Sequence, residues 1–189
     1  MEMHIEKKNG FIEFIKKYGM YVAVGAVVFV IALTFTLVAT LHQTVPTNTA
    51  NLSFKMPMQN ASVIKDFSDS ELQNNETLNQ WEAHLSVDLT AENSDVYAIL
   101  DGTIAEVSYS FLDGHSIEIK HANGFSTIYS SLDENILVNV GDSVTAGQLI
   151  GYAGESASGE LDLGNHLCLT MKLNDKSVDP NNYLDLQQK

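Results

Sequence analysis

The longest uninterrupted apolar stretch of the chain lies near its N-terminus. No charged residue occurs between Tyr18 and Leu41, and most side chains in this stretch are aliphatic, aromatic or Thr. At 1.5 Å per residue, about 22 residues of helix span roughly 33 Å, which matches a hydrocarbon core of about 30 Å. A cleaved signal peptide is the alternative, but the run is longer than a usual signal core and no Ala-x-Ala site follows it. The pattern therefore predicts a transmembrane helix over residues 20–41, preceded by a cytoplasmic tail over residues 1–19.

The stretch that follows is polar and interrupted by proline. It is rich in Thr, Asn, Gln and Ser, and Pro46 and Pro57 are incompatible with a continuous helix. Apolar side chains between Phe54 and Val63 indicate that the fold starts within it. We predict that residues 42–76 form a stalk that includes the start of the fold.

From Val96 onward, short apolar runs alternate with turn residues. β-Branched and aromatic residues dominate four segments, which we predict to be strands: residues 96–100, 103–107, 116–120 and 125–129. Asp-Gly and Asn-Gly pairs separate these segments and favour tight hairpin turns at Asp101-Gly102, Asp113-Gly114 and Asn123-Gly124. Many short strands with frequent turns predict an all-β domain, an antiparallel sandwich or barrel-like fold, over residues 77–184, followed by a tail over residues 185–189.

The charge of the chain is acidic and unevenly placed. There are 24 Asp and Glu against 10 Lys and no Arg, which gives a net charge of −14. Residues 1–41 carry four Lys and three Glu, a net of +1, so the remainder carries −15. This excess of acid argues against a nucleic-acid partner. Because the Lys cluster precedes the apolar segment and the acidic part follows it, we expect a cytoplasmic N-terminus and an extracytoplasmic domain.

Candidate chemistry gathers in two short motifs, His84-x-x-x-Asp88 and Gly-x-His166-Leu-Cys168. Residues two apart on a strand project from the same face, so His166 and Cys168 can share one pocket. His, Asp and Cys are all zinc ligands, and three protein ligands with one open position are typical of a catalytic zinc site. However, a lone Cys is usually a small buried hydrophobe, and a buried His and Asp can satisfy each other without a metal. Both interpretations stay open on these residues alone.

The order of the motifs along the chain resembles that of the LytM-type (lysostaphin-like) zinc metallopeptidases. The match runs without a gap from His84 to Cys168 and includes three further motifs: His121-x-Asn123-Gly124, Tyr129-Ser-Ser-Leu132 and Gly141-Asp-x-Val144-x-x-Gly147-Gln148. The resemblance implies the antiparallel LytM (duplicated-hybrid-motif) fold. The third motif is shared with biotinyl and lipoyl carrier domains, but no Lys lies between Lys120 and Lys172 to serve as their attachment point.

The resemblance also implies roles for five positions. In active members three residues hold zinc; His84 and Asp88 match two of them, and Cys168 stands where the third, a His, is found. A thiolate binds zinc but makes a metal-bound water less acidic. Of two catalytic histidines, His166 matches one and Ser131 replaces the other. Losing a positioned acid/base group costs about 10²–10⁴-fold in rate. We therefore expect an inactive metallopeptidase homologue, with zinc as the one candidate cofactor.

A narrower resemblance covers the ends of the predicted domain. The anchor, the short stalk, the Thr77–Trp81 lead-in and the closing Val178–Leu184 segment are similar to the stage II sporulation protein Q family, degenerate LytM proteins of endospore-forming bacteria. This resemblance implies a single-pass protein of the forespore membrane whose domain faces the space between forespore and mother cell. It also implies a partner resembling stage III sporulation protein AH, bound across the intermembrane space in a tether or channel-like hetero-oligomeric ring during engulfment.

Two other functions stay open on the sequence: a zinc-dependent peptidoglycan endopeptidase that uses Cys168 as a ligand, or a regulator of separate wall hydrolases. Either would bring contact with peptidoglycan. Regulators of this kind usually carry coiled coils, and residues 42–80 show no sustained heptads. Trp81, just before the first motif, is either a core residue at one end of the sandwich or an exposed anchor for a partner.

Overall fold

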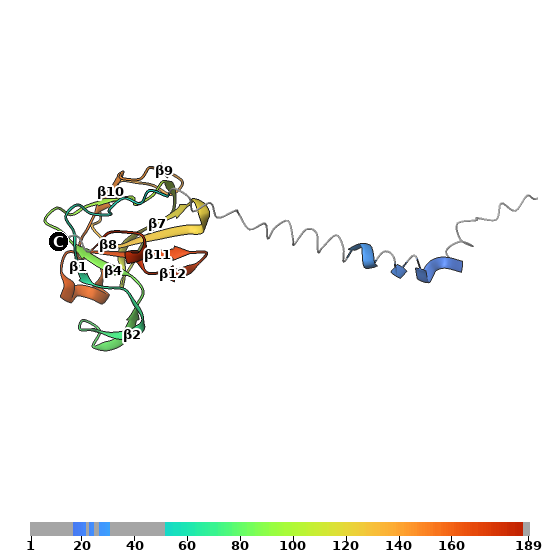
Figure 1. The fold of residues 1–189 in the computed structure, drawn as a ribbon, viewed down its shortest axis with the longest axis horizontal. Coiled ribbons are helices and arrows are strands. Elements are labelled where there is room, and N and C mark those ends of the chain that lie inside the picture. The colour runs from blue at the N-terminus through green and yellow to red at the C-terminus, as the bar shows by residue number, and fades with distance from the viewer. Residues whose placement is uncertain (1–16, 22, 25–26, 31–51, 187–189) are drawn as a thin grey trace, which may run out of the picture. The chain divides into compact units, whose positions relative to one another are not determined.

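The structure is a computed structural model, and the residues that it describes are 17–21, 23–24, 27–30 and 52–186 (Figure 1). The chain divides into two compact units, residues 1–45 and 46–189. The described residues of the first unit are helical. Among the described residues, no helix is long and apolar enough to cross a membrane, and most of the predicted transmembrane segment 20–41 lies outside them.

The second unit is built around one antiparallel sheet of eight strands. Seven follow the order β1-β4-β11-β8-β7-β6-β9, and β12 pairs with β11. The strands are β1 (Ser62–Lys65), β4 (Val87–Thr90), β6 (Gly102–Ser110), β7 (Gly114–His121), β8 (Phe125–Leu132), β9 (Ser143–Val144), β11 (Leu167–Leu173) and β12 (Lys176–Val178).

Two small antiparallel sheets complete this unit. One pairs β5 (Asp95–Tyr97) with β10 (Leu149–Tyr152), and the other is the hairpin of β2 (Ser68–Asn75) and β3 (Gln80–His84). The β2–β3 hairpin extends away from the main sheet in Figure 1. Short 3-10 helices η1 (Ala122–Gly124) and η2 (Ser158–Leu163) lie between strands, and η3 (Pro180–Asn182) follows β12. This architecture confirms the predicted all-β antiparallel fold.

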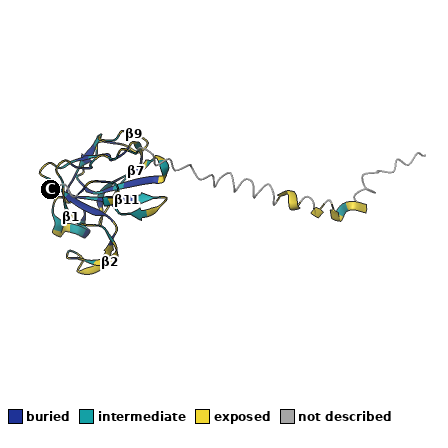
Figure 2. Ribbon diagram, in the orientation of Figure 1, coloured by how far each residue is buried: buried dark blue, intermediate teal, exposed yellow. Residues whose placement is uncertain are grey.

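The core explains the alternation seen along the strands. In β11, the side chains of Leu167, Leu169 and Met171 are fully buried, and the residues between them are only half-buried (Figure 2). Ile117 and Ile119 of β7 are buried in the same way. Successive strand residues point to opposite faces, so one face of the sheet covers the core. Burying each such side chain contributes about 1.5–3 kcal/mol.

Two of the three predicted hairpin turns are confirmed. Asp113-Gly114 lies where β6 turns into β7, and Asn123-Gly124 joins β7 to β8. Asn123 and Gly124 have φ values of 63° and 78°, a region that Asn and Gly adopt more readily than other residues.

The predicted hairpin at Asp101-Gly102 is wrong, because β5 pairs with β10 and not with β6. The Asp101 carboxylate accepts a 2.7 Å hydrogen bond from the Ala146 amide, which ties this segment to a distant turn. A Cβ atom on Gly102 would lie 2.6 Å from the Lys120 carbonyl oxygen. The glycine therefore permits close approach of two backbones rather than a turn.

The fold begins before residue 77. The ring of Phe54 packs 5.6 Å from that of Phe125 and 5.4 Å from that of Tyr183, and Met58 is buried. Strands β1 and β2 also precede residue 77. Residues of the segment 42–76 therefore pack with the domain, and the bounds of that segment stay a prediction.

Candidate functional site

His84 is held by the backbone at the end of β3. Its Nδ1 atom lies 3.0 Å from the carbonyl oxygen of Asp66, which can only accept, so Nδ1 carries the hydrogen. Nε2 lies 3.1 Å from both the Asp88 carboxylate and the Ser86 hydroxyl. A histidine that binds a metal through one ring nitrogen usually donates the N–H of the other to a carbonyl or carboxylate. The His84 ring is arranged in this way, with Nδ1 toward a carbonyl and Nε2 toward the carboxylates.

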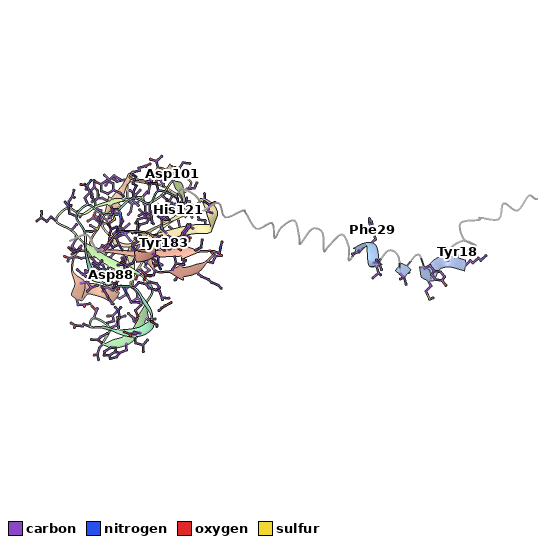
Figure 3. The ribbon with its side chains drawn as sticks, in the orientation of Figure 1. Tyr18, Phe29, Asp88, Asp101, His121 and Tyr183 are labelled. Atoms are coloured by element: carbon purple, nitrogen blue, oxygen red, sulfur yellow. The ribbon has the colours of Figure 1, made fainter. Side chains whose placement is uncertain are left out.

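Asp88 lies in β4, and its side chain is fully buried. Figure 3 labels it on the side of the domain from which the β2–β3 hairpin extends. Neither carboxylate oxygen has a hydrogen-bond partner, and His84 Nε2 lies 3.1 Å from Oδ2 as an ion-pair contact. An ionised carboxylate buried without donors costs several kcal/mol unless a cation compensates it.

Glu160, which the sequence motifs do not include, completes the cluster. It comes from η2 and places Oε1 3.6 Å from His84 Nε2 and 3.8 Å from Lys65 Nζ. Ligand atoms of His84, Asp88 and Glu160 all lie within 4.8 Å of one another. No spacing rule connects a residue of an irregular loop with the His84-x-x-x-Asp88 motif, so the sequence carried no signal for it.

His166 immediately precedes β11 and also faces Glu160. Its Nδ1 lies 2.7 Å from the Gly164 carbonyl oxygen, and its Nε2 lies 3.4 Å from Glu160 Oε2. Glu160 thus stands between two imidazoles, with one carboxylate oxygen toward each. The structure brings the predicted residues His84, Asp88 and His166 together around this unpredicted one.

Cys168 lies in β11 directly opposite Asp88 of β4 and Ser130 of β8. Burial raises the pKa of its thiol well above the usual range, and the charges of Asp88 and Glu160 raise the pKa further. A thiol with a raised pKa stays protonated in the absence of metal, whereas the thiolate is the ligand form. Cys168 is half-buried beside the cluster and is not one of the three residues whose ligand atoms gather.

Ser131 is fully buried, and its hydroxyl donates to the Gly154 carbonyl oxygen at 3.3 Å. Its φ of 57° lies in the left-handed region. The hydroxyl is occupied by backbone, and a serine cannot exchange a proton near neutral pH as an imidazole can.

The charged groups of the cluster shift the pKa values of their neighbours toward the ionised forms. Burial alone would lower the pKa of His84, but Asp88 and Glu160 outweigh it and raise this pKa to about 9. Burial would raise the pKa of Glu160, but His166, His84 and Lys65 lower it to about 2. The pKa of His166 is raised, because Glu160 and the Gly164 carbonyl outweigh its burial. Without a metal, the carboxylates of Asp88 and Glu160 therefore keep His84 in its charged form at neutral pH.

A groove of about 370 Å³ runs past the cluster, between the β2–β3 hairpin and the turn that joins β6 to β7. His84, Glu160 and Cys168 line it, and the apolar side chains of Leu78 and Leu112 flank them. The donor types of the cluster beside the groove fit a divalent metal: an imidazole with its tautomer set, and two carboxylates of which one is buried without a hydrogen bond.

Trp81 does not belong to the core, because 69% of its surface is exposed. It lies opposite Asn74 in the β2–β3 hairpin, and Leu72, 61% exposed, lies opposite Ala83. Residues two apart share a face, so Leu72 and Trp81 are diagonal neighbours on one side of the hairpin. The interpretation of Trp81 as a core residue is thus wrong.

Comparison with known proteins gives concordant results. The chain is 31% identical over 137 residues to stage II sporulation protein Q of Bacillus subtilis (strain 168), covering 67% of this chain and 48% of that protein. It therefore spans about half the length of this curated relative. In the solved structure of the SpoIIQ–SpoIIIAH pore forming complex, the similar chain is 28% identical with a TM-score of 0.62, over 71% of this chain and 92% of that one.

A zinc containing peptidase from Vibrio cholerae has the same fold, with 25% identity and a TM-score of 0.58 over 73% of this chain and 40% of that one. The profile of peptidase family M23 matches residues 82–180, which is more than half of the chain and includes His84, Asp88, Glu160 and Cys168. The chain belongs to peptidase family M23.

Proposed function

We propose that this chain is a catalytically inactive M23 domain that binds a partner protein resembling stage III sporulation protein AH during sporulation. The observation that carries the proposal is its likeness to the SpoIIQ–SpoIIIAH complex, which extends over 92% of that solved chain. The partner bridges the space between forespore and mother cell, so that the two proteins form a tether or a channel-like hetero-oligomeric ring.

The loss of peptidase activity is supported by Ser131 and Cys168. Ser131 stands where the family resemblance expects a catalytic histidine, and its hydroxyl is bonded to backbone. Cys168 stands where the resemblance expects the third zinc ligand, a histidine. Without an imidazole at position 131, His166 is the one catalytic histidine that remains. The loss of a positioned acid/base group usually lowers the rate by about 10²–10⁴-fold.

The β2–β3 hairpin offers a surface for the partner. Leu72 and Trp81 expose 61% and 69% of their surfaces on the same side of it. Exposed aromatic residues with a neighbouring aliphatic side chain are typical anchors of protein interfaces. Strand β1 lies at one edge of the main sheet, the position at which a partner can add a strand.

The placement of the protein follows the same proposal. Residues 1–19 lie in the cytoplasm, residues 20–41 cross the forespore membrane, residues 42–76 lead into the domain, and the M23-like domain over 77–184 faces the intermembrane space. The Lys cluster before the apolar run and the net charge of −15 after residue 41 support this orientation.

Co-elution tests the binding proposal. The full-length chain in detergent is mixed with the soluble domain of the stage III sporulation protein AH homologue from the same organism, and the mixture is separated by size. A joint peak is expected for the wild-type chain and for Val140→Ala, whose residue is 61% exposed and lies just before β9 in the chain. Separate elution of the two wild-type proteins would contradict the proposal.

A zinc-dependent peptidoglycan endopeptidase is the second candidate. Its support is the groove of about 370 Å³ beside a cluster of donors suited to a metal. Regulation of separate wall hydrolases is a third, which would share the contact with peptidoglycan. Release of soluble muropeptides from purified walls distinguishes the enzyme from both binding functions.

A further inference from the structure

We infer that the chain binds one divalent transition-metal ion, of the class of zinc, through His84, Asp88 and Glu160, and that this ion fixes the η2 loop to the domain. This donor set differs from the set that the family resemblance implies, because Glu160 comes from outside the family motifs and takes the place expected for residue 168. The inference does not depend on the proposed partner.

The separations of the donor atoms fit a shared ion. Zinc–ligand bonds of about 2.0–2.2 Å in a tetrahedral arrangement place ligand atoms about 3.3–3.6 Å apart. His84 Nε2 lies 3.1 Å from Asp88 Oδ2 and 3.6 Å from Glu160 Oε1, and all three residues bring ligand atoms within 4.8 Å of one another. Two carboxylates also balance the charge of a divalent cation.

Asp88 is the least satisfied candidate ligand of the cluster. Its carboxylate is fully buried and neither oxygen accepts a hydrogen bond, although His84 Nε2 lies 3.1 Å away as an ion-pair contact. The same Nε2 atom also lies 3.1 Å from the Ser86 hydroxyl, so one nitrogen faces two oxygens. A divalent cation bound by both groups would satisfy the buried carboxylate directly.

The second carboxylate oxygen of Glu160, Oε2, holds the side chain in the orientation in which Oε1 can bind the ion. Oε2 lies 3.4 Å from His166 Nε2, and the His166 ring is fixed in turn by its 2.7 Å contact with the Gly164 carbonyl. Contacts of this kind around a ligand usually contribute about 10–100-fold to metal affinity. Cys168 lies beside the cluster but outside the group of gathered ligand atoms.

The η2 loop that carries Glu160 also holds the hairpin. The Gly159 carbonyl accepts a 3.0 Å bond from Asn75 Nδ2. The Asp162 amide donates to the Thr77 hydroxyl at 3.0 Å, and this hydroxyl also bonds the Asp162 carboxylate. An ion at Glu160 therefore stabilises the position of the hairpin that exposes Trp81. The metal has a structural role, which an inactive domain can retain.

The full-length chain, purified in detergent and stripped with a chelator, is titrated with zinc and, separately, with cobalt. One zinc per chain is expected for the wild type and for Cys168→Ser. Glu160→Gln keeps the shape of the side chain and should bind zinc at least about 100-fold more weakly. Removing a metal ligand lowers the affinity more than removing a residue that only contacts a ligand, which costs about 10–100-fold. Glu155→Gln, the same change at an exposed position, is the matched control and should bind normally.

Cobalt identifies the donors directly. We expect visible bands of a cobalt site with nitrogen and oxygen ligands and no thiolate-to-cobalt charge-transfer band. That band in the wild type, lost in Cys168→Ser, would overturn the inference in favour of a cysteine ligand. Normal zinc affinity in Glu160→Gln would also overturn it, as would a wild type that takes up no metal.

Hydrogen exchange tests the structural role, with far-ultraviolet circular dichroism as a check that each variant is folded. Zinc should slow the exchange of amides in residues 158–163 and in the β2–β3 hairpin of the wild type, and not in Glu160→Gln. Stoichiometric zinc binding without any slowing in residues 158–163 would show that the ion does not fix this loop.

Discussion

The Nε2 atom of His84 approaches Asp88 to 3.1 Å, and yet neither oxygen of this fully buried carboxylate accepts a hydrogen bond. Ligand binding to the folded state stabilises it by about 2.7 kcal/mol when the free ligand is a hundredfold above its Kd. We expect zinc at that concentration to raise the Tm of the chelator-treated wild type by several degrees. Asp88→Asn should show no rise from its own metal-free Tm, and an equal rise in both proteins would contradict a role of Asp88 as a ligand.

Trp81→Ala should weaken partner binding with little change in stability. A buried interface anchor typically contributes at least about 2 kcal/mol, which corresponds to roughly 30-fold in Kd. Because 69% of Trp81 is exposed in the free chain, its replacement should change the free energy of unfolding by less than about 0.5 kcal/mol. Calorimetric titration with the partner domain and denaturant unfolding provide the two values. Equal Kd values for wild type and variant would exclude this face of the hairpin as the interface.

Asn75 should fix the hairpin to the domain. The side chain is buried, and it donates to the Gly159 carbonyl at 3.0 Å and to Glu82 at 2.9 Å while accepting from the Leu78 amide at 2.9 Å. Asn75→Ala leaves these groups without a partner, at a cost of about 1–3 kcal/mol. We expect faster hydrogen exchange in β2 and β3. The control is Asn74→Ala, an exposed neighbour on the other face, and similar exchange in both variants would refute the role.

Protonation of His121 should lower the stability of the domain in mild acid. Its Nε2 accepts a 2.7 Å bond from the Thr127 hydroxyl while Nδ1 donates to the Asp101 carbonyl, and burial lowers its pKa below 6.5. The folded state then binds fewer protons than the unfolded state. This contribution to stability is therefore complete above pH 6.5 and decreases as the pH falls below that value.

Denaturant unfolding at pH 7.5 and 5.5 measures this effect. The wild type should lose more free energy of unfolding between the two pH values than His121→Asn does, because the difference between the proteins isolates one titrating group. The same loss in both would show that protonation of His121 does not affect folding.

Much of the fold was predictable because local chemistry and tertiary structure agree. Asn123-Gly124 adopts the left-handed conformations that its residues favour, and Asp113-Gly114 lies at a real hairpin. At Asp101-Gly102, the same type of pair serves a close approach to the Lys120 carbonyl instead. A pair of turn residues does not reveal which strands will be neighbours, because that depends on contacts far apart in the sequence.

The site was predictable only where motif spacing carried information. His84 and Asp88 lie together as their motif indicates, and Cys168 lies directly opposite Asp88 on the adjacent strand. Glu160 belongs to an irregular loop, and only the folded chain brings it to His84. The exposure of Trp81 could not be predicted either, since an aromatic residue in a strand is compatible with both a core and an interface.

The most direct test of the account is wall digestion by the metal-loaded full-length chain. We propose that this M23 domain keeps the groove and the metal donors but lacks the acid/base group that the family resemblance expects at Ser131, whose hydroxyl bonds the Gly154 carbonyl. Purified peptidoglycan is incubated with the zinc-loaded protein, beside an active lysostaphin-type enzyme as the positive control. We expect no soluble muropeptides above the level without protein. Zinc-dependent release of muropeptides by the wild-type chain would contradict it.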